Sequence, residues 1–205
     1  MAERLPMFPL QAVVFPFTAV PLRVFEPRYQ ALLDRVLRDE SSFGTVLIER
    51  GSEVGGGEER FEVGTRLRVV GVTEMEEGHR GVVVAGVGRI RVDRWLEDDP
   101  HPWAEVSEYP DGADPASSDS LARARSLLER LMAIVSELGE DTRGIDLDVS
   151  EDPVTASFQL AALTPVTPLD AHRLLVAADP RRRVSTIIEM LDEQIGLLRA
   201  SLGEA

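Results

Sequence analysis

The spacing of apolar residues changes character once along this chain of 205 residues. From residue 5 to about residue 109, short apolar runs alternate with polar residues or are broken by Pro and Gly, which is typical of β-strands. From residue 118 to residue 202, apolar residues recur every three or four positions, which is typical of amphipathic helices. The sequence therefore predicts an α+β protein of two domains, with strands in residues 1–112 and helices in residues 113–205.

The first half favours short strands joined by tight bends. Phe43–Glu49 is expected to form a buried strand, Arg66–Met75 and Arg80–Val87 a hairpin, and Trp103–Tyr109 a final strand. One helix is expected to interrupt them, because Pro27 suits a first helical position. The apolar residues after it follow helical spacing: Tyr29, Leu32, Leu33, Val36 and Leu37. Many short strands with bends suggest a small twisted barrel, covered on one side by this helix.

The second half predicts four helices after a linker at residues 110–118. They span about 119–138 with Gly139 as C-cap, 154–163 with Ser150 as N-cap, 168–178, and 180–202. The seam of the last helix consists of Val184, Ile188, Leu191, Ile195, Leu198 and Leu202. This seam either packs against the helix at 119–138 or forms a homodimer or partner contact through the C-terminal helix.

Charge and residue usage exclude several classes of function. The net charge is −14, and all 22 basic residues are arginine, so binding to a phosphate backbone is disfavoured. Without lysine there is no ATPase P-loop, no Schiff-base amine and no Ser–Lys dyad, and without cysteine there is no thiol chemistry. We therefore expect no enzyme of these classes, no cofactor and no metal, and no nucleic-acid partner.

Neither a membrane span nor a signal peptide is expected. No apolar run reaches 18 residues, and Pro6, Pro9, Pro16 and Pro21 break up the apolar N-terminal stretch. A cytoplasmic protein is the resulting expectation.

A series of short motifs near the N-terminus carries a family resemblance. The series consists of Met7-Phe8-Pro9-Leu10, Val14-Phe15-Pro16, Pro21 to Tyr29, Phe43-Gly44, Glu53-Val54-Gly55, Val63-Gly64-Thr65 and Gly86 to Val92. In this order and spacing it resembles the Lon N-terminal domain family, most strongly in the stretch P-L-x-x-F-E-x-R-Y. At one position of these motifs this chain has Ile90, where members of the family more often carry Phe. The resemblance covers the first ~95 residues, and in the helical half it extends to Leu174-Leu175, Asp179 and Arg183.

The resemblance implies a PUA-like pseudo-barrel with one inserted helix, followed by a C-terminal helical bundle. It also implies a polypeptide-recognition module without catalytic machinery. Its expected partners are unfolded or degron-bearing polypeptides, with a protease as a further partner if the module acts as an adaptor.

The candidate peptide- or partner-binding residues gather around these motifs. They are Arg23, Phe25, Glu26, Arg28, Tyr29, Glu53, Arg89 and Arg91. Several also have a structural interpretation: Glu26 caps the helix start while Tyr29 enters the core, Arg89 and Arg91 pair with nearby acids, and Glu53 lies in a glycine-rich loop.

Two other functions remain open at this point. A small-molecule site or an unrecognised enzyme could occupy a pocket where barrel and bundle meet. RNA binding is the third possibility, which the charge of −14 opposes.

Overall fold

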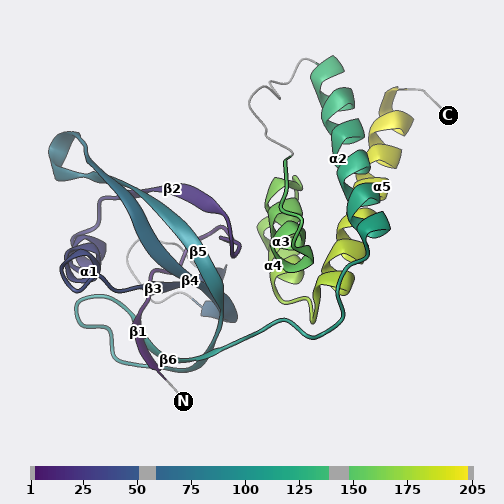
Figure 1. The fold of residues 1–205 in the computed structure, drawn as a ribbon. Coiled ribbons are helices and arrows are strands. Elements are labelled where there is room, and N and C mark those ends of the chain that lie inside the picture. Colours follow the sequence, from purple (N-terminus) through teal and green to yellow (C-terminus); the bar gives the residue numbers. More distant parts are fainter. Residues whose placement is uncertain (1–2, 51–58, 139–147, 203–205) are drawn as a thin grey trace. The chain divides into compact units, whose positions relative to one another are not determined.

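The computed structural model describes residues 3–50, 59–138 and 148–202 (Figure 1). Its chain contacts divide into two compact units, residues 1–110 and residues 111–205. The first unit contains one sheet of six strands, all pairs of which are antiparallel, and the second contains helices. The strands are β1 (Glu3–Pro6), β2 (Ala19–Val24), β3 (Phe43–Arg50), β4 (Glu59–Glu74), β5 (Arg80–Trp95) and β6 (Trp103–Glu108).

The sheet has the strand order β1-β6-β5-β4-β3, and β2 pairs with β5 beside this path. The segment after β1 bends away and bonds to β3: the amides of Phe8 and Leu10 donate to the carbonyls of Gly44 and Val46 at 2.8 and 3.0 Å. These bonds connect the first and last strands of the order. The chain thus ties two edges of the sheet together, which leaves fewer backbone groups without partners.

The predicted hairpin is confirmed, and its two strands are longer than the sequence indicated. The 3₁₀ turn at Glu76–Gly78 joins them, and Gly78 has φ of 73°, a conformation that glycine adopts without strain. We expected β5 to end near Val87, but its pairing with β4 continues through Gly88 and Arg89. The glycines weaken the strand pattern in the sequence, whereas in the fold they allow close backbone approach: a Cβ on Gly86 would collide with the carbonyl of Phe15.

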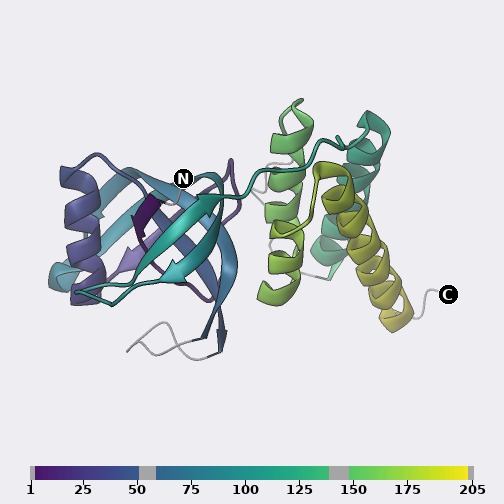
Figure 2. The ribbon, with the colours of Figure 1, turned by 90° about the horizontal axis from the view of Figure 1, so that it is seen from below.

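Helix α1 (Pro27–Arg38) packs its apolar face against the strands (Figure 2). Four of its five predicted core residues are buried: Tyr29, Leu32, Leu33 and Val36. Leu37 is the exception, with 41% of its surface exposed, because it lies outside the stripe that faces the sheet. The ion pair of Asp34 with Arg80 also links α1 to the start of β5.

The second unit contains the four predicted helices: α2 (Ser118–Glu137), α3 (Pro153–Leu163), α4 (Pro168–Leu175) and α5 (Pro180–Leu202). Ser150 is not the N-cap of α3, as we had expected. Asp152 has that place, and its carboxylate accepts from the Thr155 amide at 2.8 Å, because Pro153 takes the first helical position. The predicted cap Gly139 lies outside the described residues.

Helix α5 packs against both α2 and α3. Its contact with α2 confirms the intramolecular interpretation of its seam, although Ile187 is buried in place of the partly exposed Ile188. Arg183 is fully buried in this unit. Its guanidinium donates to the Leu174 carbonyl, to Ser157 and to Asp111 at 3.1, 2.7 and 2.5 Å. None of the described helices has both the length and the apolar character that a bilayer span requires.

Candidate functional site

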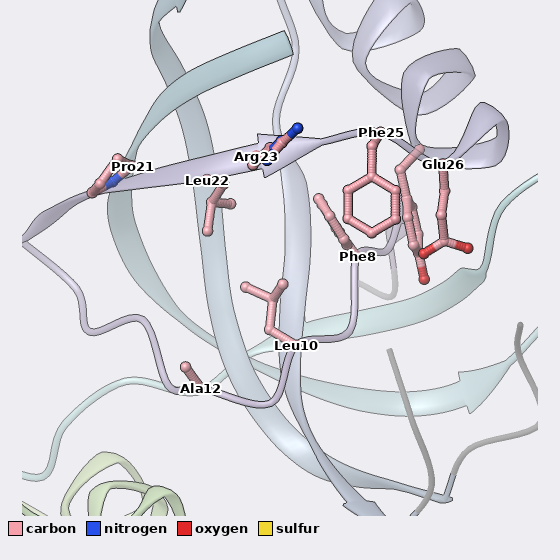
Figure 3. A pocket seen from close by; sticks show the side chains of 9 residues that line it. Phe8, Leu10, Ala12, Pro21, Leu22, Arg23, Phe25 and Glu26 are labelled. Carbon is pink, nitrogen blue, oxygen red and sulfur yellow. The ribbon is translucent and has the colours of Figure 1, made fainter. Parts of the chain in front are cut away.

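A groove of about 320 Å³ lies in the first unit, between β2 and the segment of the chain that precedes it (Figure 3). Figure 3 shows β2 on one side and Phe8, Leu10 and Ala12 on the other, with Phe25 and Glu26 where α1 begins. The lining residues are Phe8, Leu10, Ala12, Pro21, Leu22, Arg23, Phe25, Glu26 and Tyr29. The fold thus brings two motifs, one around Phe8 and one around Phe25, to a single site.

The floor of the groove is apolar and formed largely by buried side chains. Phe8, Leu10 and Ala12 are alternate residues of the segment after β1, and all three line the groove. The ring of Phe8 stacks on that of Tyr29, with centroids 4.0 Å apart. Both rings and Leu10 belong to the buried core of the unit. The floor is therefore a surface of the core itself and needs no rearrangement to receive an apolar ligand.

One wall of the groove is the backbone of β2. Pro21, Leu22 and Arg23 all line it. Successive side chains of a strand point to opposite faces, so three consecutive residues can line one groove only if the edge of the strand faces it. In the described sheet β2 pairs with β5 and with no other strand.

An ion pair forms the corner where β2 leads into α1. The Glu26 carboxylate accepts from Arg28 Nε at 3.1 Å, and the guanidinium of Arg28 lies 4.4 Å from the centroid of the Tyr29 ring. The expectation that the Glu26 side chain caps the helix is therefore wrong, because this carboxylate is held by Arg28. Its backbone carbonyl instead accepts from the amides of Tyr29 and Gln30. Tyr29 enters the core as predicted.

A second corner joins β2 to the hairpin turn. Arg23 Nη2 donates to His79 Nδ1 at 2.8 Å, and the Phe25 ring lies edge-on to the imidazole at 6.0 Å. Gln30 fixes the turn from α1 by donating to the Gly78 carbonyl at 3.0 Å. This support leaves the Phe25 ring 45% exposed beside an apolar floor. An exposed aromatic ring held in this way is a suitable anchor for an apolar partner.

The other predicted site residues lie elsewhere. Arg89 and Arg91 each place their guanidinium 4.6 Å from the centroid of the Tyr109 ring, while Ile90 and Val92 enter the core on the opposite face. The arginines and the aliphatic residues thus lie on opposite faces of β5, and the arginine pair does not line the groove. Glu53 lies outside the described residues.

A further pocket, of about 460 Å³, lies at the start of β6. It is lined by Arg4, Arg35, Leu96, Glu97, Asp99 and Trp103. Arg35 stacks over the Trp103 ring at 4.9 Å. Two cations and two carboxylates balance each other here, which favours solvent over an apolar ligand. Within the described ranges, no group of three or more His, Asp or Glu side chains is placed to hold a metal ion.

Five groove residues were missing from the predicted set. Phe8, Leu10, Ala12, Pro21 and Leu22 line the groove, although Phe8-Pro9-Leu10 and Pro21-Leu22 were among the motifs that carried the resemblance. The alternation of Phe8, Leu10 and Ala12 was the available signal. It shows which residues share a face, but the proximity of that face to Phe25 depends on tertiary contacts.

Known proteins resemble this chain over nearly its whole length. Lon protease 2 of Sorangium cellulosum (strain So ce56) is 29% identical over 206 residues, a match that covers 97% of this chain and 26% of the relative. The Lon protease of Anaeromyxobacter dehalogenans is 26% identical, with 96% of this chain and 24% of the relative covered. The chain thus spans about a quarter of the length of these curated relatives.

Solved structures show the same fold. The Lon N-terminal domain protein from Xanthomonas campestris superposes with a TM-score of 0.67 at 29% identity, covering 91% of this chain and 98% of that one. The N-terminal domain of the Mycobacterium avium complex Lon protease gives 0.65 at 17% identity, covering 93% and 99%. The family model of the ATP-dependent protease La (LON) substrate-binding domain matches residues 4–193. The chain therefore belongs to the Lon substrate-binding domain family.

Proposed function

We propose that this chain is a non-catalytic module that recognises unfolded or degron-bearing polypeptides, either directly or as an adaptor to a protease. The observation that carries the proposal is the groove, where the exposed ring of Phe25 stands beside the preformed apolar floor of Phe8 and Leu10. Unfolded chains differ from folded ones in exposing apolar side chains, and a groove of this kind distinguishes the two. Membership of the substrate-binding family supports the same function.

We also propose a finer division of the architecture. We assign residues 1–112 to a PUA-like pseudo-barrel and residues 113–205 to a helical bundle. In this proposal, Arg23, Phe25, Glu26, Arg28 and Tyr29 form the binding surface. Arg89 and Arg91 form a secondary surface, and Glu53, which lies outside the described residues, is a further candidate contact. The module works in the cytoplasm without cofactor, metal or nucleic acid. A homodimer that forms through α5 is the alternative to a monomer.

A binding experiment with a matched control tests the proposal. The probe is a fluorescently labelled, permanently unfolded model protein, and the same protein in its folded form is the specificity control. Phe25→Asn should weaken binding of the unfolded form about 10-fold or more, because interface aromatics carry much of the binding free energy. Phe17→Asn is the matched control, since Phe17 is also 45% exposed but lies outside the groove.

The two variants separate the possible results. Selective binding of the unfolded form that depends on Phe25 and not on Phe17 supports a recognition module at this groove. Equal losses in both variants would place binding elsewhere on the first unit. No binding at high micromolar concentrations, or equal binding of both forms of the probe, would overturn the proposal.

A further inference from the structure

We infer that the groove receives its ligand as an added antiparallel strand on the free edge of β2, with an acidic residue of the ligand beside Arg23. The ligand is an extended polypeptide segment with apolar residues at alternate positions. This inference rests on the proposed function and specifies how the same site holds its ligand. It follows from the direction of the backbone groups of β2, the lining of the groove and one charge.

The backbone of β2 has a defined inner and outer edge. The carbonyl of Thr18 accepts from the Gly86 amide at 2.9 Å, so residue 18 turns its polar groups toward β5. These groups alternate along a strand, and the register that pairs Ala19 with Ala85 continues to Val24. Residues 20 and 22 therefore bond to β5. The polar groups of Ala19, Pro21 and Arg23 point to the outer edge.

The outer edge is available in the described part of the chain. There, the backbone groups of Ala19, Pro21 and Arg23 have no hydrogen-bond partner. Pro21 has no N–H, and because its position faces outward, no hydrogen bond between β2 and β5 is lost. The edge thus offers three carbonyl acceptors and two amide donors. Unpaired groups of this kind are the template on which β-strand addition takes place.

The sides of the added strand meet different surroundings. Leu22 points into the groove (Figure 3), and on this side an added strand would lay alternate side chains over Phe8 and Leu10. The other side carries the exposed side chain of Arg23, with Pro21 and Ala19. An added strand is therefore apolar on the groove side and polar on the Arg23 side.

The charge at the groove specifies the polar side of the ligand. Glu26 is neutralised by Arg28. The guanidinium of Arg23 donates to His79 Nδ1, and within the described residues it has no carboxylate partner. The edge of the groove therefore has one unbalanced positive charge, in a protein whose net charge is −14. An acidic residue opposite Arg23 complements this charge.

The test uses the full chain and a labelled synthetic peptide in which valine alternates with serine and one central serine is replaced by glutamate. In antiparallel addition, the serine and glutamate residues bond to β2 and the valines face the groove. N-methylation of the serine and glutamate amides should therefore weaken binding about 10-fold or more. N-methylation of the valine amides is the matched control and should change binding less than about 2-fold. Equal effects of the two sets, or the reverse order, overturn the inference.

Two further measurements locate the strand and the charge. Peptide binding should slow hydrogen exchange of the Ala19 and Arg23 amides and leave exchange of the bonded Leu22 amide unchanged. Unchanged exchange at Ala19 and Arg23 overturns the assignment to β2.

Arg23→Gln should lower the affinity for the glutamate peptide about 2–5-fold and leave the affinity for its glutamine counterpart unchanged. Arg68→Gln, at an exposed arginine outside the groove, is the control.

The proposed function and this inference fail in different ways. If an unfolded protein binds at the Phe25 surface but the peptide does not displace it, strand addition is overturned. The proposed recognition function still stands in that case. If neither the unfolded protein nor the peptide binds, both are overturned.

Discussion

The ring of Phe8 lies against the ring of Tyr29, with centroids 4.0 Å apart and planes inclined by 22°. Phe8 comes from the segment after β1, and Tyr29 from the first turn of α1. This one contact joins two segments that are distant in the sequence and forms the floor of the groove. Stability of the first unit and shape of the groove therefore depend on the same pair.

Replacing Phe8 should affect folding as well as binding. Phe8→Ala removes a buried ring and leaves a cavity against Tyr29, so we expect a loss of about 3–5 kcal/mol in the free energy of unfolding. Urea denaturation followed by circular dichroism measures this quantity. The exposed ring of Phe17 provides the comparison, and Phe17→Ala should cost less than about 0.5 kcal/mol. Similar losses in the two variants would contradict the assignment of Phe8 to the core.

Two glycines in one motif should respond differently to the same change. A Cβ on Gly86 would meet the Phe15 carbonyl, whereas a Cβ on Gly88 meets nothing within 4 Å. Gly86→Ala should therefore cost about 1–3 kcal/mol, because the backbone around Phe15 has to move. Gly88→Ala should stay within about 0.5 kcal/mol of the wild type in thermal or chemical unfolding. Equal tolerance at both sites would mean that β5 and Phe15 are not in close contact.

The buried guanidinium of Arg183 should stabilise the helical unit. It bonds to Leu174, Ser157 and Asp111 and lies 3.5 Å from the centroid of the Phe158 ring. Arg183→Leu removes the guanidinium that donates to the largely buried Asp111 carboxylate, and we expect a loss of about 3–5 kcal/mol in unfolding free energy. The neighbouring Arg182 is exposed, so Arg182→Leu is the matched variant and should be nearly neutral. A neutral Arg183→Leu would show that Asp111 is well solvated without it.

The same ion pair predicts where the chain can be divided. A fragment of residues 113–205, the domain boundary expected from the sequence, lacks Asp111, and a fragment of residues 111–205 retains it. Because the shorter fragment loses the ion pair between Asp111 and the buried Arg183, we expect that fragment to be less stable by about 3–5 kcal/mol. Circular dichroism of both fragments during urea titration measures the difference. Identical midpoints would show that the Asp111 contact adds nothing.

Stability should also fall in mildly acidic solution because of His101. Burial lowers the pKa of this imidazole below its ordinary value of 6.5, so the unfolded chain binds a proton more readily than the folded one. The stabilisation is fully present above about pH 6.5 and is lost as pH falls through the lower folded-state pKa. Urea denaturation between about pH 7.5 and pH 5 should show this decline. His101→Gln should flatten the slope in this range, and an unchanged slope would assign the decline to another group.

Much of the secondary structure followed from local patterns. The spacing of Tyr29, Leu32 and Leu33 predicted the buried face of α1, and Pro180 to Leu202 was predicted as the last helix with the bounds that the structure shows. Errors occurred where two local rules compete. Ser150 and Asp152 are both good caps, and Pro153 decided between them. The strand expected to end near Val87 continues instead, because its pairing with β4 includes Gly88 and Arg89.

The candidate site was only partly predictable for a similar reason. The sequence identified Phe25, Glu26 and Tyr29 from one continuous motif, because residues close in sequence stay close in space. It did not place Phe8 and Leu10 beside them, since that proximity arises from hydrogen bonds to β3 and from stacking on Tyr29. It also grouped Arg89 and Arg91 with the site, although both lie against Tyr109.

By itself, the sequence determined the two classes of secondary structure, the family, and the absence of lysine and cysteine chemistry, because each of these depends on residue type and local spacing. Tertiary structure alone decided that the backbone edge of β2 faces an apolar floor, that Arg28 takes the carboxylate expected to cap α1, and that Arg183 reaches Asp111. Such relationships join residues far apart in the chain or depend on which of several partners comes within bonding distance. Local periodicity carries no information on either.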